Sequence, residues 1–420
     1  MELANKLFKG DRVIWIIFMF LCLISVIEVF SATSTLAYKS SNFWAPIVRH
    51  ASFLLAGFVL ILILHNIPCR FFSALILLLP ISALLLLLTP FIGISTNDAH
   101  RFLEFFGIRF QPSELAKLSC IVYVAFLLSR QDKLGEDTVF KYILIGVCVI
   151  CVLIFPENFS TSVMLFCICY LMIFIGEIPL KKVGKLTLVF IIAMALLITL
   201  LFVLPNNMIE GVARLETMKG RITDFFIDKP KLDAATYQIT KDNYQVTQAQ
   251  IAIANGGLFG KLPGHGQQRD FLPQAFSDFI YAIIIEEMGV VGGFIVLILY
   301  IILMIRVGII ARKCEKLFPK YLVLGCGLAI IVQAFLNMAV AVDFFPVTGQ
   351  PLPLVSRGGT STVITCVYIG IILSVSRFGA GMGNEEDEEM EEDPDVIEID
   401  TDISDDSSLE ALETISEKKV

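Results

Sequence analysis

Long runs of hydrophobic residues, separated by short polar stretches, dominate the pattern of this sequence. A helix needs about 20 mostly apolar residues to cross the hydrocarbon core of a bilayer. Ten runs approach or exceed that length: residues 13–33, 47–66, 71–93, 114–129, 141–156, 159–178, 184–204, 278–305, 320–342 and 359–377. The pattern therefore predicts an all-α, polytopic integral membrane protein with ten transmembrane helices.

Positive residues are unevenly distributed among the connections between these runs. They gather in alternate connections, as at Lys181 and Lys182 or at Arg312 and Lys313. Cytoplasmic loops of membrane proteins carry such an excess of Lys and Arg. We therefore expect both termini in the cytoplasm, and a large extracytoplasmic loop at 205–277, before the eighth span.

Composition supports a membrane protein and separates one end of the chain from the rest. Of the 420 residues, 56% are hydrophobic, more than a soluble protein of this length could bury. Residues 384–420 hold 17 of the 40 acidic residues and two of the 32 basic ones, so this end carries a net charge of −15 and the remainder +7. Such a block of like charge lacks the apolar residues needed to fold. We predict a transmembrane domain at 1–378 and an acidic, disordered cytoplasmic tail at 379–420.

Cysteines give no sign of a disulfide framework or a metal centre. Eight of the ten lie within apolar runs, and the long polar loop has none. Membrane-buried free thiols are the simplest interpretation. Cys167 and Cys169 have no second pair of ligands nearby in sequence, so no metal site is predicted. No nucleic-acid partner is expected.

The first of three polar clusters on the predicted outer side spans residues 97–117. Arg101, Arg109 and Lys117 bring three positive charges to a side that is usually poor in them. Arg49, at the outer start of the second span, is a fourth candidate. Together these cations would suit an anion such as a lipid phosphate.

An ordinary helix start is the alternative explanation of this cluster. Ser113 is a candidate N-cap, with Pro112 just before it. Glu114 and Lys117 are three residues apart, so they share a helix face and favour an ion pair.

The second cluster runs from Asn255 to Asp278. Its glycines, Gly256 and Gly260 among them, permit a re-entrant or tightly turned backbone. Asp278 begins the eighth span, where Ser277 is a candidate cap. From spacing alone, a carboxylate stabilised by the helix macrodipole is favoured about two to one over a catalytic group. Further along this span, Glu286 and Glu287 point to different sides of the helix, so at least one must face protein or water.

The third cluster, residues 343–360, is rich in proline and glycine and apolar between them. Irregular backbone beside a membrane is tolerated when it packs on protein or lines a cavity. A discontinuous helix of an ion-coupled carrier would have similar composition, and a simple long outer loop is a further alternative.

In order and topology, the three clusters resemble the SEDS family of peptidoglycan polymerases, whose branches serve cell elongation (RodA) and cell division (FtsW). Four strings carry the resemblance over residues 11–377: Phe110-Gln-Pro-Ser-Glu-Leu-Ala-Lys117, Asn255-Gly-Gly-Leu-Phe-Gly-Lys261, Phe271-Leu-Pro followed by Ser277-Asp-Phe and Glu286-Glu-Met-Gly289, and Pro346-Val-Thr-Gly-Gln-Pro-Leu-Pro-Leu-Val-Ser-Arg-Gly-Gly359. The opening residues are more similar to the division branch.

The resemblance implies an enzyme, fold and partners. Such proteins polymerise lipid II into β-1,4-linked glycan strands on the outer face of the bacterial inner membrane and release undecaprenyl pyrophosphate. Their essential aspartate falls on Asp278, the expected catalytic base. The residues expected to bind substrate are Arg49, Arg101, Arg109, Glu114, Lys117, Asp270 and Ser356. Expected partners are a class B penicillin-binding protein acting as transpeptidase, other divisome proteins and membrane lipids.

Some positions depart from the family pattern. Asn158 stands where the family often has an aspartate, and Arg357 where it usually has a tyrosine. The first departure puts a role in metal binding in doubt, so no cofactor is assigned and a divalent cation stays an open alternative. A lipid II flippase would use Glu286 and Glu287 along a polar path to both leaflets. A RodA-type elongation polymerase and a division scaffold without activity are further alternatives.

Overall fold

The computed structural model describes residues 8–32, 44–96, 99–105, 108–203, 219–223, 225, 243–272 and 275–379. Helices dominate this part of the chain: α2 (Arg12–Ala32), α4 (Ala45–Leu64), η1 (Cys69–Leu77), α5 (Leu78–Ile92), α6 (Pro112–Leu128), α7 (Gln131–Leu134), α8 (Glu136–Ile154), α9 (Phe159–Ile175), α10 (Leu180–Val203), α13 (Tyr244–Gly256), η2 (Gln268–Asp270), α14 (Ile280–Lys313), α15 (Leu317–Ala341) and α16 (Thr360–Phe378). Apart from Gly379, the predicted acidic tail lies outside the described residues.

Every predicted span corresponds to a helix. Within the described residues, eight helices are long and apolar enough to cross a membrane, counting η1 and α5 as one span. The other two, α6 and α9, have 17 residues each, at the short end of the range for a spanning helix. The polytopic all-α fold is therefore confirmed, whereas the count of ten crossings stays a prediction.

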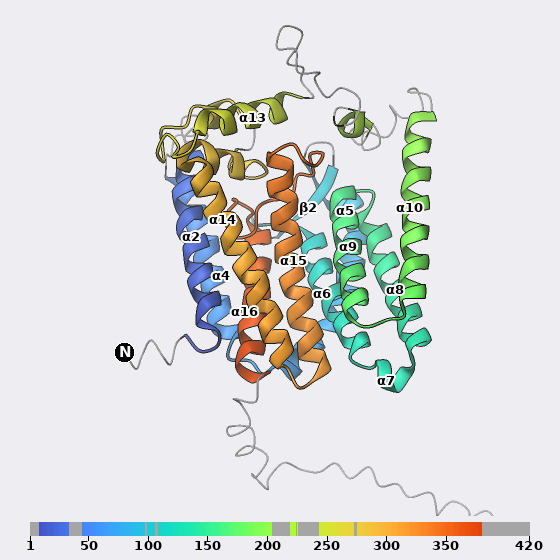
Figure 1. The fold of residues 1–420 in the computed structure, drawn as a ribbon. Helices are drawn as coiled ribbons and strands as arrows, with labels where there is room; N and C mark the ends of the chain where they lie inside the picture. Colours follow the sequence, from blue (N-terminus) through green and yellow to red (C-terminus); the bar gives the residue numbers. More distant parts are fainter. Residues whose placement is uncertain are drawn as a thin grey trace, which may run out of the picture. The chain divides into compact units, whose positions relative to one another are not determined.

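Three central helices form the core of the bundle. α6, α15 and α16 are buried along most of their length. On one side they pack against α4 and α14, with α2 beyond, and on the other against α8 and α9 (Figure 1). α10 contacts α9 at the edge and is almost entirely exposed.

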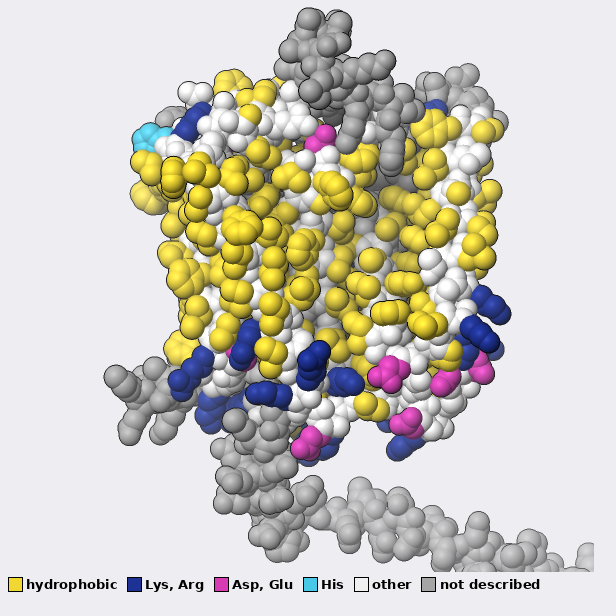
Figure 2. Space-filling model, in the orientation of Figure 1, with side chains coloured by type: hydrophobic (Ala, Val, Ile, Leu, Met, Phe, Trp, Pro, Cys, Tyr) yellow, Lys and Arg dark blue, Asp and Glu magenta, His cyan; other side chains and the backbone are white. Residues whose placement is uncertain are grey.

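On the face shown in Figure 2, hydrophobic side chains cover the helices of the bundle, as expected of a protein with lipid as its solvent. Basic and acidic side chains gather at the lower end of this view, around the turns that join the helices. Lys182, near the start of α10, lies 2.6 Å from Asp137 on α8. All ten cysteines are free, as the sequence predicts.

The first polar cluster contains strands that the sequence analysis did not predict. β1 (Ile94–Thr96), β2 (Ala99–Phe105) and β3 (Ile108–Phe110) form a small antiparallel sheet of order β1-β2-β3. Arg109 on β3 lies opposite Glu104 on β2 in the antiparallel strand register. The sheet turns the chain back between α5 and α6 and carries Arg101 on its middle strand.

Two predicted helix caps are wrong. α6 begins at Pro112, so Ser113 lies inside the helix; Gln111 precedes the helix and makes no side-chain cap bond. α14 begins at Ile280, so Ser277 and Asp278 lie before it. A proline suits the first helical position because its missing N–H needs no partner there, which explains the earlier start of α6. Asp278 therefore lies just before α14, in an irregular segment, and its carboxyl is not on a face of the helix.

Candidate active site

The segment that joins α15 to α16 folds inward and packs against the residues before α14. Ser356 makes the contact: its hydroxyl donates to the carbonyl of Ser277 (2.6 Å) and accepts from the backbone N–H of Leu352 (2.7 Å). The backbone N–H of Arg357 donates to the carbonyl of Phe276 (2.9 Å). The third polar cluster is therefore a packed, hydrogen-bonded floor under Asp278. We call residues 350–357 the floor segment.

Asn337 of α15 ties the floor segment directly to the candidate base. Its side-chain amide donates to the backbone carbonyl of Asp278 and to that of Gln350, both at 2.8 Å. Gln350 in turn donates to the hydroxyl of Thr161 at the start of α9 (2.9 Å). These buried bonds fix the backbone of Asp278 against two helices that are distant in sequence. Buried amide groups need such partners, because each unsatisfied one is costly.

Lys117 and Glu114 support the same floor segment from α6. The Lys117 ammonium lies 2.8 Å from the Glu114 carboxylate, as the spacing predicts, and donates to the side-chain oxygen of Gln333 (3.1 Å). Gln333 passes the contact on by donating to the carbonyl of Pro351 (2.9 Å). Lys117 is only 1% exposed and Glu114 only 3%. The pair is therefore buried inside the protein and supports the floor segment through Gln333.

Asp278 itself is partly buried and faces positive charge. Its carboxylate accepts a hydrogen bond from the Ser277 hydroxyl (2.9 Å) and lies against Gly349, where an added Cβ would come within 3.6 Å of it. Burial raises the pKa of this carboxyl above its usual value, whereas the Ser277 hydroxyl and the charges of Arg221 and Arg101 act to lower it. A carboxyl with a raised pKa beside cations has the properties of a general base next to an anion site.

Of the other predicted site residues, one acts on Asp278 and three are exposed on the protein surface. Arg101 acts electrostatically on Asp278 and donates to the backbone carbonyl of Glu157 (3.1 Å). Arg49 is exposed at the start of α4, and its charge acts on Arg357. Arg109 is exposed on β3. Asp270 is exposed on η2, where Arg269 lies 3.9 Å from it.

Three residues of this site were missed in the sequence analysis. Arg221 comes from the long connection between α10 and α13, where a single basic residue gives no signal of its own. Asn337 and Gln333 are a buried polar pair four residues apart within an apolar helix. Their position in a predicted span was the available signal, because polar side chains there need a partner.

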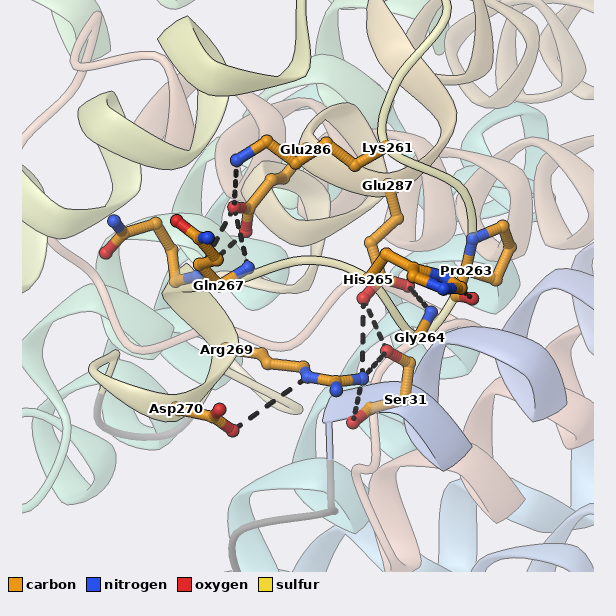
Figure 3. Close-up of polar contacts among 11 residues, drawn as sticks. Ser31, Lys261, Pro263, Gly264, His265, Gln267, Arg269, Asp270, Glu286 and Glu287 are labelled. Carbon is orange, nitrogen blue, oxygen red and sulfur yellow. Dashed lines mark hydrogen bonds and ion pairs between the residues drawn. The ribbon is translucent and has the colours of Figure 1, made fainter.

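Glu286 is used to hold the chain between α13 and Asp278 (Figure 3). Its carboxylate accepts the backbone N–H of Gln267 (2.9 Å) and of Gln268 (3.1 Å), and Lys261 lies 3.5 Å away. A carboxylate that accepts backbone N–H groups is well satisfied in a buried position.

Glu287 points to the other side and holds a second part of the same segment (Figure 3). It accepts the hydroxyl of Ser31 and the backbone N–H of Gly264 (3.0 Å), and Arg269 lies 3.8 Å away. Both glutamates are fully buried in protein, which confirms the expectation that at least one faces protein or water. We call Glu286, Glu287 and residues 261–269, which they hold, the glutamate latch.

Within the part of the chain that the structure describes, no three His, Cys, Asp or Glu side chains come together as a candidate ligand set. Asn158, at the position where the resemblance raised a metal role, accepts the backbone N–H of Thr161 (3.2 Å) and caps α9.

Comparison with known proteins gives one family. The FtsW/RodA/SpoVE family of cell cycle proteins matches residues 11–380. A probable peptidoglycan glycosyltransferase FtsW of Nitrosococcus halophilus is 33% identical over 361 residues, which cover 83% of this chain and 87% of that protein. Its counterpart in Legionella pneumophila is 32% identical, over 82% of this chain and 85% of that protein.

Solved structures share the fold. A chain of a peptidoglycan synthase complex that coordinates polymerization and crosslinking superimposes with a TM-score of 0.70 at 22% identity, covering 89% of this chain and 99% of that one. The rod shape determining protein RodA of Thermus thermophilus gives a TM-score of 0.60 at 22% identity, covering 88% and 97%.

Proposed function

We propose that this chain, which belongs to the FtsW/RodA/SpoVE family of cell cycle proteins, is a peptidoglycan glycosyltransferase of the FtsW type. The observation that carries the proposal is identity near one third to proteins of that name over more than four fifths of the chain. We propose cell division as its setting, because these relatives are of the FtsW branch. Conversion of lipid II into glycan by the purified protein is the direct test.

The proposed reaction joins two lipid-linked disaccharides on the outer side of the membrane. The 4-hydroxyl oxygen of the acceptor sugar attacks the anomeric carbon of the donor, and a β-1,4 bond forms. The bond from that carbon to the pyrophosphate oxygen breaks, and undecaprenyl pyrophosphate leaves with the electron pair. Asp278 takes the hydroxyl proton and later gives it to water. Its raised pKa supports this role, because a base is most effective when its pKa is close to the working pH.

The leaving pyrophosphate gains negative charge in this step, and cations near Asp278 would stabilise it. We propose Arg101 and Arg221 for this task, because both charges act on Asp278. Arg49 and Arg109 are exposed, and we propose that they attract the same anionic substrate from the membrane surface. Asp270, exposed on η2 ahead of Asp278, is proposed to contact the sugar part.

Replacing Arg101 with Ala is expected to raise the lipid II concentration needed for half-maximal rate. Loss of a hydrogen bond to a charged group costs about 1.5–3 kcal/mol, which corresponds to roughly 10- to 150-fold. Arg70→Ala, which changes an exposed arginine at the second position of η1, is the matched control and should behave as wild type. Equal kinetics for Arg101→Ala and Arg70→Ala at limiting lipid II would remove Arg101 from the anion site.

For Glu114, Lys117 and Ser356 we propose a positioning role in place of direct substrate contact. Each is no more than 4% exposed. Ser356 belongs to the floor segment, Lys117 bonds to Gln333, which holds that segment, and Glu114 pairs with Lys117. Substrate would have to displace these bonds to reach them.

We propose that the protein lies in the bacterial inner membrane with both termini cytoplasmic. The gathering of basic side chains at one end of the bundle supports this orientation (Figure 2). A cysteine at Asn255, near the end of α13, should then react with membrane-impermeant maleimide in intact spheroplasts. A cysteine at Lys133, on α7, should react only after lysis. The reverse pattern would invert the topology. Exposed native cysteines are replaced first in both variants.

Crosslinking requires a partner, and we propose a class B penicillin-binding protein. The support is a solved structural relative that belongs to a complex coordinating polymerization with crosslinking. Other divisome proteins and membrane lipids complete the proposed surroundings. A flippase gains less support, because Glu286 and Glu287 are bonded within the glutamate latch.

A further inference from the structure

Residues 257–262, which follow α13, run along the first part of α14. Four backbone hydrogen bonds join the two segments: Lys261 N–H to Glu286 O (3.0 Å), Leu262 N–H to Glu287 O (2.8 Å), Val290 N–H to Gly257 O (3.0 Å) and Val291 N–H to Leu258 O (3.3 Å). We call residues 257–262 the tip. N–H groups of each segment donate to carbonyls of the other. The tip therefore lies directly beside residues 286–291, the part of α14 that contains the kink.

Glycines allow this contact to be unusually close. A Cβ added to Gly260 would lie 2.3 Å from the Glu287 carbonyl oxygen, and one added to Gly289 would lie 2.2 Å from that of Leu258. Both glycines have a positive φ, of 76° and 73°, which other residues rarely adopt. The tip is therefore fixed against α14 and follows its position in the membrane.

Apolar side chains of the tip point away from the protein. Leu258 is 59% exposed, Phe259 77% and Leu262 66%. On α14 at the same level, Val290 and Val291 are also exposed. In Figure 1 the loop that follows α13 lies at the upper left of the bundle, and in the same orientation Figure 2 shows hydrophobic side chains there that adjoin the apolar band over the helices below. Exposed apolar side chains that continue this band extend the surface that lipid can cover.

The length of α14 sets the depth of the tip. The helix has 34 residues, about 51 Å at 1.5 Å per residue, whereas the hydrocarbon core is about 30 Å thick. It changes direction at Gly289. The 24 residues from 290 to 313 span about 36 Å, enough to cross the core alone. The kink, and the tip with it, then lies at the outer boundary of the hydrocarbon.

We infer that the tip inserts Leu258, Phe259 and Leu262 into the outer leaflet and that lipid acyl chains cover them. Leucine and aromatic side chains are favoured at this boundary of the bilayer. The glutamate latch joins the tip to Arg269 and Asp270. Insertion would thus set the height of the segment leading to Asp278 relative to the lipid surface, where a lipid-linked sugar emerges.

Tryptophan fluorescence tests the depth of the tip. Phe259→Trp is purified as the full chain and reconstituted in vesicles of phosphatidylcholine and phosphatidylglycerol, with or without bromine on the upper acyl chain. Phe344→Trp is the matched control, because Phe344 is equally exposed, at 77%, in the turn after α15. The parent protein, which has Trp15 and Trp44, provides the baseline to subtract.

We expect brominated lipid to quench the added fluorescence of Phe259→Trp at least twofold more than that of Phe344→Trp, and aqueous iodide to show the opposite order. Leu262→Trp should repeat the result, and it replaces Phe259→Trp if that variant fails to fold. Quenching by iodide but not by bromine would overturn the inference. So would protection from both quenchers that appears only when a transpeptidase partner is added, because the tip would then be a protein interface.

Discussion

Replacing Asp278 with Asn is expected to lower the rate of glycan formation by about 10²- to 10⁴-fold, the usual effect of losing a general base. The amide keeps the size of the side chain and still accepts the Ser277 hydroxyl, but it does not take a proton. The backbone bond from Asn337 to Asp278 does not involve the carboxyl, so the fold should be kept. Lipid II binding should survive, because the arginines remain.

The control for this variant is Asp137→Asn, which changes an exposed aspartate on α8. It should polymerise as wild type. A rate near wild type for Asp278→Asn, in protein shown to be monodisperse, would end the assignment of Asp278 as base.

Wild type should also lose rate with acid. Burial raises the pKa of this carboxyl, so the rate should be full above the raised pKa and fall as pH drops through it, at a pH above the ordinary aspartate value of about 3.9.

Replacing Lys117 with Met is expected to reduce stability strongly. The variant would leave Glu114 buried without its cation, and breaking a buried ion pair in this way costs about 3–5 kcal/mol. The bond to Gln333 would be lost as well, so the floor segment under Asp278 should loosen and activity should fall. Heating in detergent, followed by size-exclusion chromatography, measures the fraction that stays folded.

Two further variants distinguish a structural role of the Glu114–Lys117 pair from a direct contact with substrate. Glu114→Gln combined with Lys117→Met removes both charges and should recover much of the lost stability, since replacing a whole buried pair is often near neutral. Lys182→Met removes the cation of a pair whose aspartate is 94% exposed and should change stability by no more than about 1 kcal/mol. If Lys117→Met melts like wild type but fails to bind lipid II, the substrate-contact role would replace the structural one.

Hydrophobic length was enough to predict the spans, because a bilayer requires a similar run from every crossing helix. The Glu114–Lys117 pair was predicted for a similarly local reason, since its spacing alone places both side chains on one helix face. Helix ends were less certain: the starts of α6 and α14 depend on how Gln111 and Phe279 leave the preceding segments.

Long-range contacts were beyond the reach of a single sequence. Asn337 meets Asp278 across 59 positions and Gln350 meets Thr161 across 189, and no local pattern specifies such pairs. The small sheet at 94–110 was missed because its short strands carry charged residues such as Arg101 and Glu104. The resemblance supplied Asp278, whereas spacing alone favoured a structural carboxylate. The structure adds the floor segment that holds it.

Glycan synthesis by the purified protein tests the central claim most directly. Wild type and Asp278→Asn are each reconstituted with a class B penicillin-binding protein whose active-site serine is replaced, and fluorescent lipid II is supplied. Products are separated on a gel. The account predicts a ladder of polymer with wild type, insensitive to penicillin, and almost none with Asp278→Asn. Absence of polymer from folded wild-type protein, with lipid II crossing the vesicle membrane instead, would contradict it.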